Sequence, residues 1–597
     1  MTDGARRYFL DVRQSARGYA WLQRLDPRQE NVALAMAQSH GLPDLVARVL
    51  AARGVDAEAT GRFLEPTIRD LLPDPATLTG MEAAATRLAD AVRTGERVAI
   101  FGDYDVDGAA ASALLRRYLA HFGVEAEIYI PDRVFEGYGP NPEAMRDLAA
   151  RAGLIVTVDC GTASATAIDA ALAAGADVVV LDHHQVGDGF PTNVPVVNPN
   201  RDDDMSGQGH LCAAGVVFLA LVQTSKLLRQ AGHTTRPPDL LGLLDLVALA
   251  TVCDVVPLTG VNRAFVTRGL VVARSQNNAG LAALAQAARI GEPLNTFHLG
   301  FAIGPRINAG GRIGDAALGS RLLATDSPAE ASEIAAKLDA LNTERQAMEQ
   351  TMLAEAMAQA DAELARGDGP AVLITESGDW HPGIVGLLAS RLKDAARRPA
   401  FAIAFNRNGI GTGSGRSIAG VDLGRLVRAA GEAGLITKGG GHAMAAGITV
   451  ERARLGALRA FFEDRAGEAV AEARRDEALK IDGALSADGA TLELIEVLER
   501  AGPYGAGHPQ PVFALPHHQV SDVRMVGTGH LRVSLRSRAG GRLQAIAFRV
   551  ADTDLGRMLG ENRGSALHVA GTLGANTWNG RTTPQLRIID AAVPEKV

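Results

Sequence analysis

Short apolar runs rich in β-branched residues alternate with alanine- and leucine-rich stretches of helical period between about residues 95 and 260. The runs cover Arg97 to Phe101, Leu154 to Val158, Val178 to Leu181 and Leu246 to Val252, the last being the most ambiguous as a strand. This alternation is typical of βαβ units. The pattern therefore predicts a parallel sheet with helices on both faces.

The pattern changes after residue 326. Ser327-Pro328-Ala329-Glu330 combines a capping serine, a proline at the first helical position and a return glutamate, and so predicts the start of a helix. Its polar, alanine-rich body, to about Ala365, indicates a connector between domains. A smaller glycine-rich α/β domain follows from about 370 to 465.

The last part of the chain, from about residue 480, contains several short runs of strand-like composition separated by turn residues. They cover Gln519 to Met525, Leu531 to Leu535, Leu543 to Phe548 and Leu567 to Leu573. Short strands at such spacing predict a small β-barrel.

Composition narrows the class of protein. A chain of 597 residues exceeds a single hydrophobic core, so several domains are expected. The net charge of −8 argues against a protein that coats nucleic acid with its whole surface, although a local basic groove remains compatible with it. The three cysteines lack CxxC spacing and predict neither disulfides nor thiolate zinc. Without an apolar run of membrane-spanning length or a signal peptide, we expect a cytoplasmic protein and no membrane partner.

Acidic residues and histidines follow the predicted strands. The segment GDYDVDG (102–108) carries Asp103, Asp105 and Asp107; the later runs end at Asp159, at Asp182-His183-His184 and at Asp254. One such aspartate is most simply a helix cap or an Asx-turn. A whole set at the carboxyl edge of one parallel sheet is different, because converging carboxylates repel unless cations neutralise them. The set therefore predicts bound metal.

The ligand types indicate which metal to expect. Carboxylates with one or two imidazoles and no thiolate suit Mn²⁺ or Mg²⁺ better than structural zinc. The number of acids favours two ions over one. Paired divalent ions are typical of phosphate-ester hydrolysis, in which they generate hydroxide and stabilise the charge on the phosphoryl oxygens.

The motifs DYDVDG, VDCG, DHH and CDVVP, in this order and spacing, resemble those of the DHH phosphoesterase superfamily. GPRINAGGRIGDA (304–316), WHPGIVGLLASRL (380–392), GSGRSI (413–418) and GGGHAMAAG (439–447) extend the resemblance, over nearly the whole chain, to the RecJ family of bacterial single-strand-specific exonucleases. The resemblance implies a 5′→3′ exonuclease that acts on single-stranded DNA in repair and recombination and releases 5′-mononucleotides.

The resemblance also implies the domain plan. A parallel-sheet DHH domain is joined by a long helix to a smaller α/β DHHA1 domain, and an OB-type β-barrel follows. The expected boundaries are an N-terminal extension at 1–80, the DHH domain at 81–326, the connector helix at 327–368, the DHHA1 domain at 369–466 and the OB-type domain at 478–597.

Residue roles carry over only where the motifs match. The resemblance implies that two Mn²⁺ or Mg²⁺ ions are held by Asp105, Asp107, Asp159, His183 and Asp254, with Asp159 as the bridge and Asp103 in or beside this set. His184 would contact the scissile phosphate as a charge stabiliser or as an acid, or else support His183. Asp182 would orient one of the two histidines.

Three glycine-rich segments offer phosphate ligands. Arg306, Asn308 and Arg312 lie in GPRINAGGRIGDA, where glycines permit close approach and arginines supply bidentate donors; a glycine-rich turn with surface arginines is the alternative. Ser414, Arg416 and His442 in the smaller domain suit a terminal phosphate. The resemblance implies that this last set holds the 5′ end of the strand.

Other motifs have weaker assignments. We interpret His381 as a residue that packs two domains together. PYGAGHPQPVF (502–513) has Tyr504 and His508 where the family pattern PFGxGNPxP has phenylalanine and asparagine, which leaves any direct role of this linker open. Candidate strand contacts on the barrel, where the alternative is a solvated face, are Arg524, His530, Arg532, Arg536, Arg538, Arg542 and Trp578.

Single-stranded DNA is the expected substrate of a monomeric enzyme, and the resemblance implies single-strand-binding protein and a recombination helicase as partners. Two other functions are considered. One is a different phosphoesterase of the superfamily, acting on oligonucleotides, cyclic dinucleotides or pyrophosphate; such enzymes are shorter and lack the barrel. The other is a non-catalytic replication factor of the same fold, for which missing metal ligands are expected.

Overall fold

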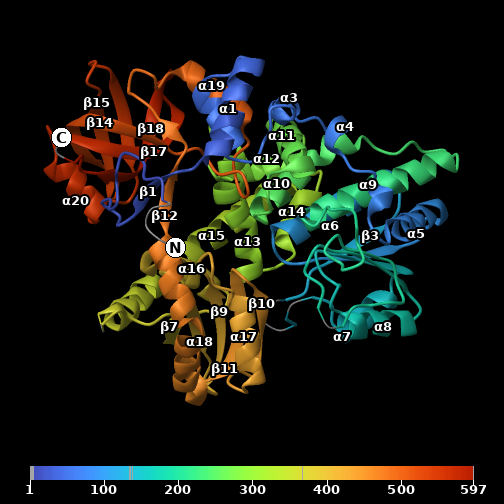
Figure 1. Cartoon of the computed structure of the whole chain (residues 1–597). Helices are drawn as coiled ribbons and strands as arrows, with labels where there is room; N and C mark the ends of the chain where they lie inside the picture. Colours follow the sequence, from blue (N-terminus) through green and yellow to red (C-terminus); the bar gives the residue numbers. More distant parts are fainter. Residues whose placement is uncertain (1–5, 133–135, 138, 188, 366, 596–597) are drawn as a thin grey trace. The chain divides into compact units, whose positions relative to one another are not determined.

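The computed structural model describes residues 6–132, 136–137, 139–187, 189–365 and 367–595 (Figure 1). The chain forms two compact units. The first unit consists of the residues up to Leu72, Pro257–Thr267 and Glu477–Val597, and the second of Pro73–Val256 and Arg268–Asp476. Every helix in the described ranges is too short or too polar to cross a lipid bilayer.

The second unit contains the predicted parallel sheet. Its strand order is β3-β2-β4-β5-β6, and every adjacent pair is parallel. Three predicted strands are confirmed as β2 (Val98–Phe101), β4 (Leu154–Val158) and β5 (Asp177–Leu181). The strands β3 (Ala126–Tyr129) and β6 (Val196–Val197) were not predicted.

Helices cover both faces of this sheet, as the alternating pattern predicted. α7 (Pro142–Ala149) and α8 (Ala165–Ala173) form one core with the side chains of Phe101, Ile155 and Val180. α6 (Val106–His121) and α9 (Ala213–Gln230) contact the strands and each other on the other side (Figure 1). The carboxyl ends of β2, β4 and β5 therefore share one edge.

The fourth predicted strand is wrong, because Leu246 to Val252 lies in the helix α10 (Leu244–Cys253). Each residue from Leu244 to Thr251 is buried, and all but Asp245 and Thr251 are apolar, so this helix has no exposed polar face. A helix without a polar face has no visible 3.6-residue period, and its sequence cannot be distinguished from that of a buried strand.

The predicted connector is confirmed as the 37-residue helix α15 (Pro328–Leu364). Ser327 caps it by accepting a hydrogen bond from the backbone of Glu330 at 3.3 Å. The return bond of a capping box is not made, because the Glu330 carboxylate accepts from Thr325 Oγ1 at 2.6 Å. The Ser327 amide also donates to Thr325 Oγ1, at 3.1 Å.

A second sheet follows α15 in the same unit, with the strand order β10-β11-β9-β8-β7. Only β7 and β8 are parallel among these described strands. The helices α16, α17 and α18 pack with it. The bounds are β7 (Leu373–Ser377), β8 (Ala400–Phe405), β9 (Ile410–Arg416), β10 (Lys438–His442), β11 (Ala445–Glu451), α16 (Val385–Ala396), α17 (Leu423–Glu432) and α18 (Leu455–Asp476).

The first unit contains the predicted barrel. Its strands follow the order β14-β15-β16-β18-β17, and β17 pairs with β14 to close it. The N-terminal residues share its core: α1 (Pro27–His40) and α2 (Asp44–Ala51) pack against barrel residues, and β1 (Ala20–Gln23) pairs with β12 (Ala478–Ile481). The barrel strands are β14 (Phe513–Val526), β15 (His530–Arg536), β16 (Arg542–Ala547), β17 (Ala566–Trp578) and β18 (Arg581–Ala592).

Three further helices are α11 (Gly260–Arg274), α13 (Gly304–Ile313) and α19 (Leu492–Ala501). The other helices are α3 (Thr60–Leu64), α4 (Ile68–Leu71), α5 (Met81–Thr94), α12 (Ala279–Ala287), α14 (Leu318–Ala324) and α20 (Asp554–Glu561).

Candidate metal centre

The loop between β2 and α6 brings three aspartates to the carboxyl edge of the parallel sheet. Asp105 caps α6, because its Oδ1 accepts hydrogen bonds from the amides of Asp107 at 2.9 Å and Gly108 at 3.2 Å. A Cβ atom at Gly108 would lie 2.5 Å from the carbonyl oxygen of Asp103. Glycine there lets the loop fold back on itself, and this places Asp103 beside the other two acids.

Asp107 is buried against the start of another helix. Its two oxygens accept hydrogen bonds from the first amides of α9, Oδ2 from Ala213 at 2.6 Å and Oδ1 from Ala214 at 2.8 Å. The amino end of a helix stabilises a carboxylate, which offsets part of the cost of burying it. The same Oδ2 lies 3.7 Å from Nε2 of His183.

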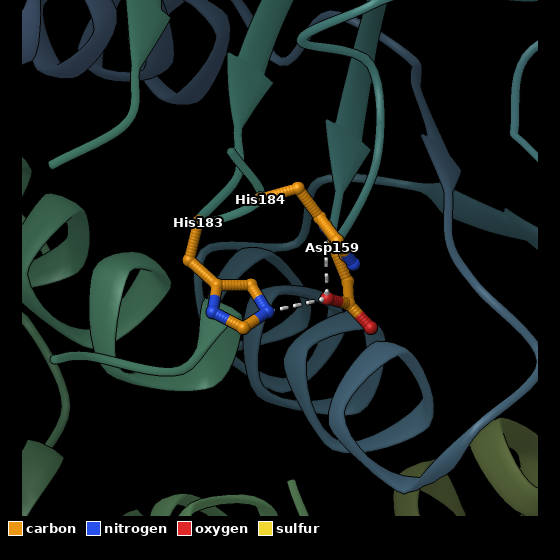
Figure 2. Close-up of side chains that lie close together, drawn as sticks. All are labelled: Asp159, His183 and His184. Atoms are coloured by element: carbon orange, nitrogen blue, oxygen red, sulfur yellow. Dashed lines mark ion pairs between the residues drawn. The ribbon is translucent and has the colours of Figure 1, made fainter. Parts of the chain in front are cut away.

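Asp159 follows β4 and lies between the two histidines (Figure 2). Its Oδ1 is 3.3 Å from Nε2 of His183 and 3.9 Å from Nδ1 of His184. Its backbone φ is 62°, in the left-handed region that aspartate adopts only at some energetic cost. The surrounding fold therefore imposes this conformation.

Asp182 accepts hydrogen bonds from the His183-His184 segment, and it belongs to none of the groups of described side chains that could hold a metal ion. Its Oδ1 accepts from Nδ1 of His184 at 2.8 Å and from the amide of His183 at 2.7 Å, and its Oδ2 accepts from the amide of Thr162. Burial opposes ionisation of Asp182, yet the bond and charge of His184 hold its pKa well below the usual value. Burial also opposes the charge on His184, but Asp182 raises the pKa of that imidazole to about 9. These contacts are those of a group that orients His184.

Two asparagines, which the sequence interpretation missed, support the same segment from behind. Asn198 is fully buried and donates to the carbonyl of His184 at 2.8 Å and to Thr162 Oγ1 at 2.9 Å. Asn200 donates to the carbonyl of His183 at 2.5 Å. Both follow the short strand β6, so the strand-end pattern that selected the aspartates also applies to this NPN segment.

Asp254 reaches the centre from the end of α10 and not from a strand. Its Oδ2 lies 3.6 Å from Nε2 of His183. Although that oxygen is buried, none of the residues that the structure describes donates a hydrogen bond to it. A buried carboxylate oxygen in this state fits a metal ligand.

Electrostatic repulsion within the cluster is strong. Burial, and then the charges of Asp107, Asp105, Asp103 and Asp254, raise the pKa of Asp159 well above its usual value. Burial and the neighbouring carboxylates raise the pKa of Asp254 to about 9. A divalent cation would reverse this effect by favouring the ionised forms.

Three overlapping sets of donor atoms, each within 4.8 Å of one another, could hold metal: Asp159, His183 and His184; Asp107, His183 and Asp254; and Asp103, Asp105 and Asp159. Asp159 and His183 each belong to two sets. The donors are carboxylate oxygens and imidazole nitrogens, which suit Mn²⁺ or Mg²⁺. The residues present therefore fit more than one such ion.

The helix α13 carries the GPRINAGG segment and packs on the aspartate loop, since a Cβ atom at Gly311 would lie 2.8 Å from the carbonyl oxygen of Tyr104. The guanidinium of Arg306 forms an ion pair with Asp339 of α15: its Nε and Nη2 lie 2.9 and 2.8 Å from Oδ1 of that aspartate. Oδ1 of Asn308 is buried and accepts no hydrogen bond within the described ranges. Arg312 donates to the carbonyl of Gly383 at 3.0 Å.

That last contact joins α13 to the WHPG segment. Gly383 lies so close that a Cβ atom on it would be 2.5 Å from the carbonyl oxygen of Arg312. Nδ1 of His381 accepts the amide hydrogen of Gly383 at 3.1 Å, and partial burial lowers the pKa of His381. His381 thus shapes the turn that meets α13.

The second sheet brings together three of the predicted phosphate ligands. Arg416 at the end of β9 donates to Ser414 Oγ at 3.0 Å. The strand register places His442 opposite Ala445 and Ala445 opposite Arg416, so these residues lie at one end of the sheet. Desolvation, with the charges of His184, Arg428 and His183, lowers the pKa of His442, which places this residue within electrostatic range of both histidines of the metal cluster.

A feature that the sequence interpretation missed lies opposite Ser414 and Arg416. A Cβ atom at Gly386, in the first turn of α16, would be 3.2 Å from Ser414 Oγ and 3.3 Å from Nη2 of Arg416. The amino end of this 12-residue helix thus borders the hydroxyl and the guanidinium, and together they suit an anion. The glycine in PGIVG was the available signal.

The candidate contacts on the barrel remain predictions. Arg524 is paired with Asp522 at 2.6 Å. Arg532, Arg536 and Arg542 occupy exposed positions of β15 and β16, and Trp578 at the end of β17 is 74% exposed.

Family models match three parts of this chain. The DHH family N-terminal domain matches residues 97–251, the DHHA1 domain matches 369–468, and the RecJ OB domain matches 481–590. The matched segments contain the parallel sheet, the second sheet and the barrel, respectively.

Curated relatives and solved structures agree with these matches. The chain is 37% identical to the single-stranded-DNA-specific exonuclease RecJ of Escherichia coli over 93% of this chain and 96% of that protein. It is 34% identical to the protein of the same name from Bacillus subtilis, over 95% of this chain and 70% of that one. A crystal structure of RecJ in complex with Mn²⁺ from Thermus thermophilus covers 97% of this chain and 80% of its own, with a TM-score of 0.77 and 30% identity. The corresponding Mg²⁺ complex has a TM-score of 0.71.

Proposed function

The chain belongs to the RecJ family, and on that basis we propose that it is a single-stranded-DNA-specific exonuclease that hydrolyses phosphodiesters with divalent metal. It degrades strands from the 5′ end, releases 5′-mononucleotides and acts in DNA repair and recombination. The observation that carries this proposal is the convergence of carboxylates on His183 at the carboxyl edge of the parallel sheet.

The metal ligands proposed are Asp105, Asp107, Asp159, His183 and Asp254, with Asp103 in or beside the set, and they hold two Mn²⁺ or Mg²⁺ ions. Asp159 is the bridge, which its membership of two donor sets supports. When bound, the ions supply hydroxide at neutral pH and offset the negative charge that develops on the phosphoryl oxygens.

His184 acts on the scissile phosphate in this proposal. The hydrogen bond from its Nδ1 to Asp182 favours the protonated imidazole, so the ring can donate a hydrogen bond or a proton to a phosphate or leaving oxygen. Asp182 holds the ring through Nδ1 and leaves Nε2 directed elsewhere. Asp182 is therefore a positioning residue for His184.

Ser414, Arg416 and His442 form the clamp for the 5′-terminal phosphate, bordered by the amino end of α16. The clamp and the metal ligands belong to two sheets of one compact unit. The clamp would hold the terminal phosphate while the metal ligands face a phosphate further along the strand, so hydrolysis would proceed from the 5′ end. Between the clamp and the metal ligands, the DNA strand is proposed to contact three residues of α13: Arg306, Asn308 and Arg312. Arg306 also links α13 to α15 through its bond to Asp339.

The barrel guides the incoming single strand through its arginines and Trp578. Single-strand-binding protein and a recombination helicase are proposed partners, and the enzyme is proposed to be a cytoplasmic monomer; these assignments are supported by family resemblance alone. All the predicted metal ligands are present, which disfavours a non-catalytic replication factor.

Digestion of end-labelled strands tests the proposal. Single-stranded and blunt double-stranded DNA, labelled at either end, are incubated with Mn²⁺, Mg²⁺ or chelator, with Asp159→Ala as the inactive control. We expect 5′-mononucleotides from the 5′ end of single strands, slow attack on duplex and no product in chelator. Release first from the 3′ label, equal digestion of duplex, or full activity in chelator would contradict it.

A further inference from the structure

The long helix α15 buries one continuous seam of side chains, which recur every three or four residues as in a coiled coil. Three neighbouring members at the middle of the seam are polar: Asn342, Arg345 and Glu349. These three residues are here named the polar layer. The members on either side of it are apolar: Ala331, Ile334, Ala335, Leu338, Met352, Ala356 and Ala360. The polar layer therefore interrupts a seam that is otherwise suited to simple hydrophobic packing.

The polar layer is bonded within α15. Nη1 of Arg345 donates to Oε2 of Glu349 at 2.6 Å, and its Nη2 donates to Oδ1 of Asn342 at 2.8 Å. Nε of Arg345 is buried and donates no hydrogen bond within the described ranges. Burial lowers the pKa of Arg345, which shows that its charge is costly to keep there. Buried ion pairs add little net stability, whereas polar groups in an apolar seam can fix how two helices align.

Glu349 also reaches a second helix. Its Oε1 accepts a hydrogen bond at 3.2 Å from Nε of Arg391, which belongs to α16. The helices α15 and α16 pack against each other in the second unit (Figure 1). One carboxylate thus bonds a guanidinium of its own helix with one oxygen and a guanidinium of the neighbouring helix with the other.

The apolar part of the contact between α15 and α16 leaves their alignment loosely specified. Methionines contribute much of the surface of α15 there, at positions 348, 352 and 357. Methionine is flexible and adapts to shifted partners. A slide of α16 by one helical turn, about 5.4 Å, would preserve such packing but would separate Arg391 from Glu349. The ion pair therefore fixes the position of α16 along α15.

The position of α16 matters because its amino end borders the clamp. A Cβ atom at Gly386 would lie 3.2 Å from Oγ of Ser414 and 3.3 Å from Nη2 of Arg416. A shift of α16 toward these side chains would press on them, and a shift away would withdraw the helix end from the bound anion. Gly386 and Arg391 are separated by little more than one turn of the same helix, so a displacement at Arg391 is carried directly to the clamp.

We propose that Glu349 is a positioning residue for the clamp: by bonding Arg391, it holds the amino end of α16 beside Ser414 and Arg416 and so supports capture of the 5′-terminal phosphate. The proposal rests on the proposed function, since it takes these two residues as the clamp. It concerns capture and not hydrolysis, because neither Glu349 nor Arg391 is among the proposed metal ligands.

The test measures kcat and KM of the full-length protein on 5′-phosphorylated and 5′-hydroxyl single strands. Arg391→Ala removes the bond between the helices, Arg391→Lys keeps the charge, and Glu349→Gln removes the shared carboxylate. Lys393→Ala is the matched control on α16, because Lys393 pairs with its neighbour Asp394 at 2.6 Å. Glu344→Gln is the control on α15, where Glu344 is exposed. Arg416→Ala is the reference for the clamp, with Mn²⁺ titration and thermal unfolding measured for every variant.

We expect Arg391→Ala to raise the KM for 5′-phosphorylated strands by roughly twofold to fivefold, the effect of losing an ion pair with one exposed partner. Glu349→Gln should raise it by roughly tenfold, because it also leaves Arg345 without its counter-charge. The KM for 5′-hydroxyl strands, kcat and Mn²⁺ affinity should stay at the parent's values, and Arg391→Lys should restore the preference for the phosphorylated end. A purely structural role would lower the unfolding midpoint without changing this preference.

Two results would overturn the proposal, and they differ. If Arg391→Ala and folded Glu349→Gln keep the parent's preference while Arg416→Ala loses it, the clamp stands and the positioning role is refuted. If Arg416→Ala also keeps the preference, the clamp itself is wrong and the proposal fails with it. Should Glu349→Gln not fold, Arg391→Ala and Arg391→Lys decide the question, because Arg391 is largely exposed and its loss leaves the seam of α15 intact.

Discussion

Replacing Arg416 by alanine should separate capture of the strand end from hydrolysis. Arg416 is half-buried at the end of β9, and its Nη1 donates to Ser414 Oγ at 3.0 Å and to the carbonyl of Gly415 at 2.9 Å. These bonds hold the guanidinium in place before substrate arrives, so little side-chain entropy is lost on binding. The contribution of the arginine should therefore appear directly in affinity.

The expected magnitude follows from the chemistry of the contact. Removing a hydrogen bond to a charged group costs about 1.5 to 3 kcal/mol, which corresponds to roughly tenfold to a hundredfold in affinity. A bidentate contact favours the upper end of this range, and partial exposure favours the lower end. The metal ligands lie on the other sheet, so Mn²⁺ affinity should stay unchanged and turnover on saturating strands should fall less than capture.

The assay measures cleavage of 5′-phosphorylated and 5′-hydroxyl single strands by the parent, by Arg416→Ala and by Arg407→Ala. Arg407 lies exposed in the turn before β9, at the opposite end of that strand, so its loss removes the same charge away from the clamp. Only Arg416→Ala should lose the preference for the phosphorylated end. If it keeps the parent's preference, the 5′ anchor lies elsewhere and the assignment of the clamp is wrong.

Three further predictions concern the catalytic domain. Asp159→Ala should lower activity by roughly a hundredfold or more with the fold intact, because it removes the proposed bridge; parent-like Mn²⁺ titration would exclude that role. Burial raises the pKa of Asp245 from 3.8 to about 6, so stability falls as pH rises through this range; Asp245→Asn should be more stable than the parent by up to about 3 kcal/mol at pH 8, and this gain should vanish at about pH 3, below the pKa of the unfolded chain, whereas a pH-independent difference in thermal unfolding would refute the shift. Asn198→Ala removes two buried hydrogen bonds and should destabilise by about 1 to 3 kcal/mol; an unchanged unfolding midpoint would show that these bonds contribute nothing.

The local sequence pattern was sufficient to predict the three strands whose ends carry most residues of the candidate metal centre. β2, β4 and β5 could be predicted because each is a short β-branched run bounded by turn residues. Parallel strands place their carboxyl ends at one edge, so Asp107, Asp159 and His183 could be expected to meet. The distances of 3.3 and 3.7 Å from His183 agree with that expectation.

Asp254 shows where such reasoning stops. Its position in CDVVP matched the family motif, but the apolar run before it is the helix α10 and not a strand. Burial on every side is a property of the neighbours of a segment, and it erases the polar face that would reveal a helical period. The capping box predicted at Ser327 forms only in part, because the Glu330 carboxylate accepts a hydrogen bond from Thr325.

The sequence by itself determined the fold class, the long connector helix, the barrel and the chemistry gathered at the strand ends, because these depend on residue type and on spacing within short windows. Tertiary structure alone decided which distant segments share a core. β1 pairs with β12 across more than 450 positions of chain, and the amide of Leu258 donates to the carbonyl of Ala506. Such contacts leave no periodicity to detect, because they arise from shape and hydrogen bonding between surfaces that exist only after each segment has folded.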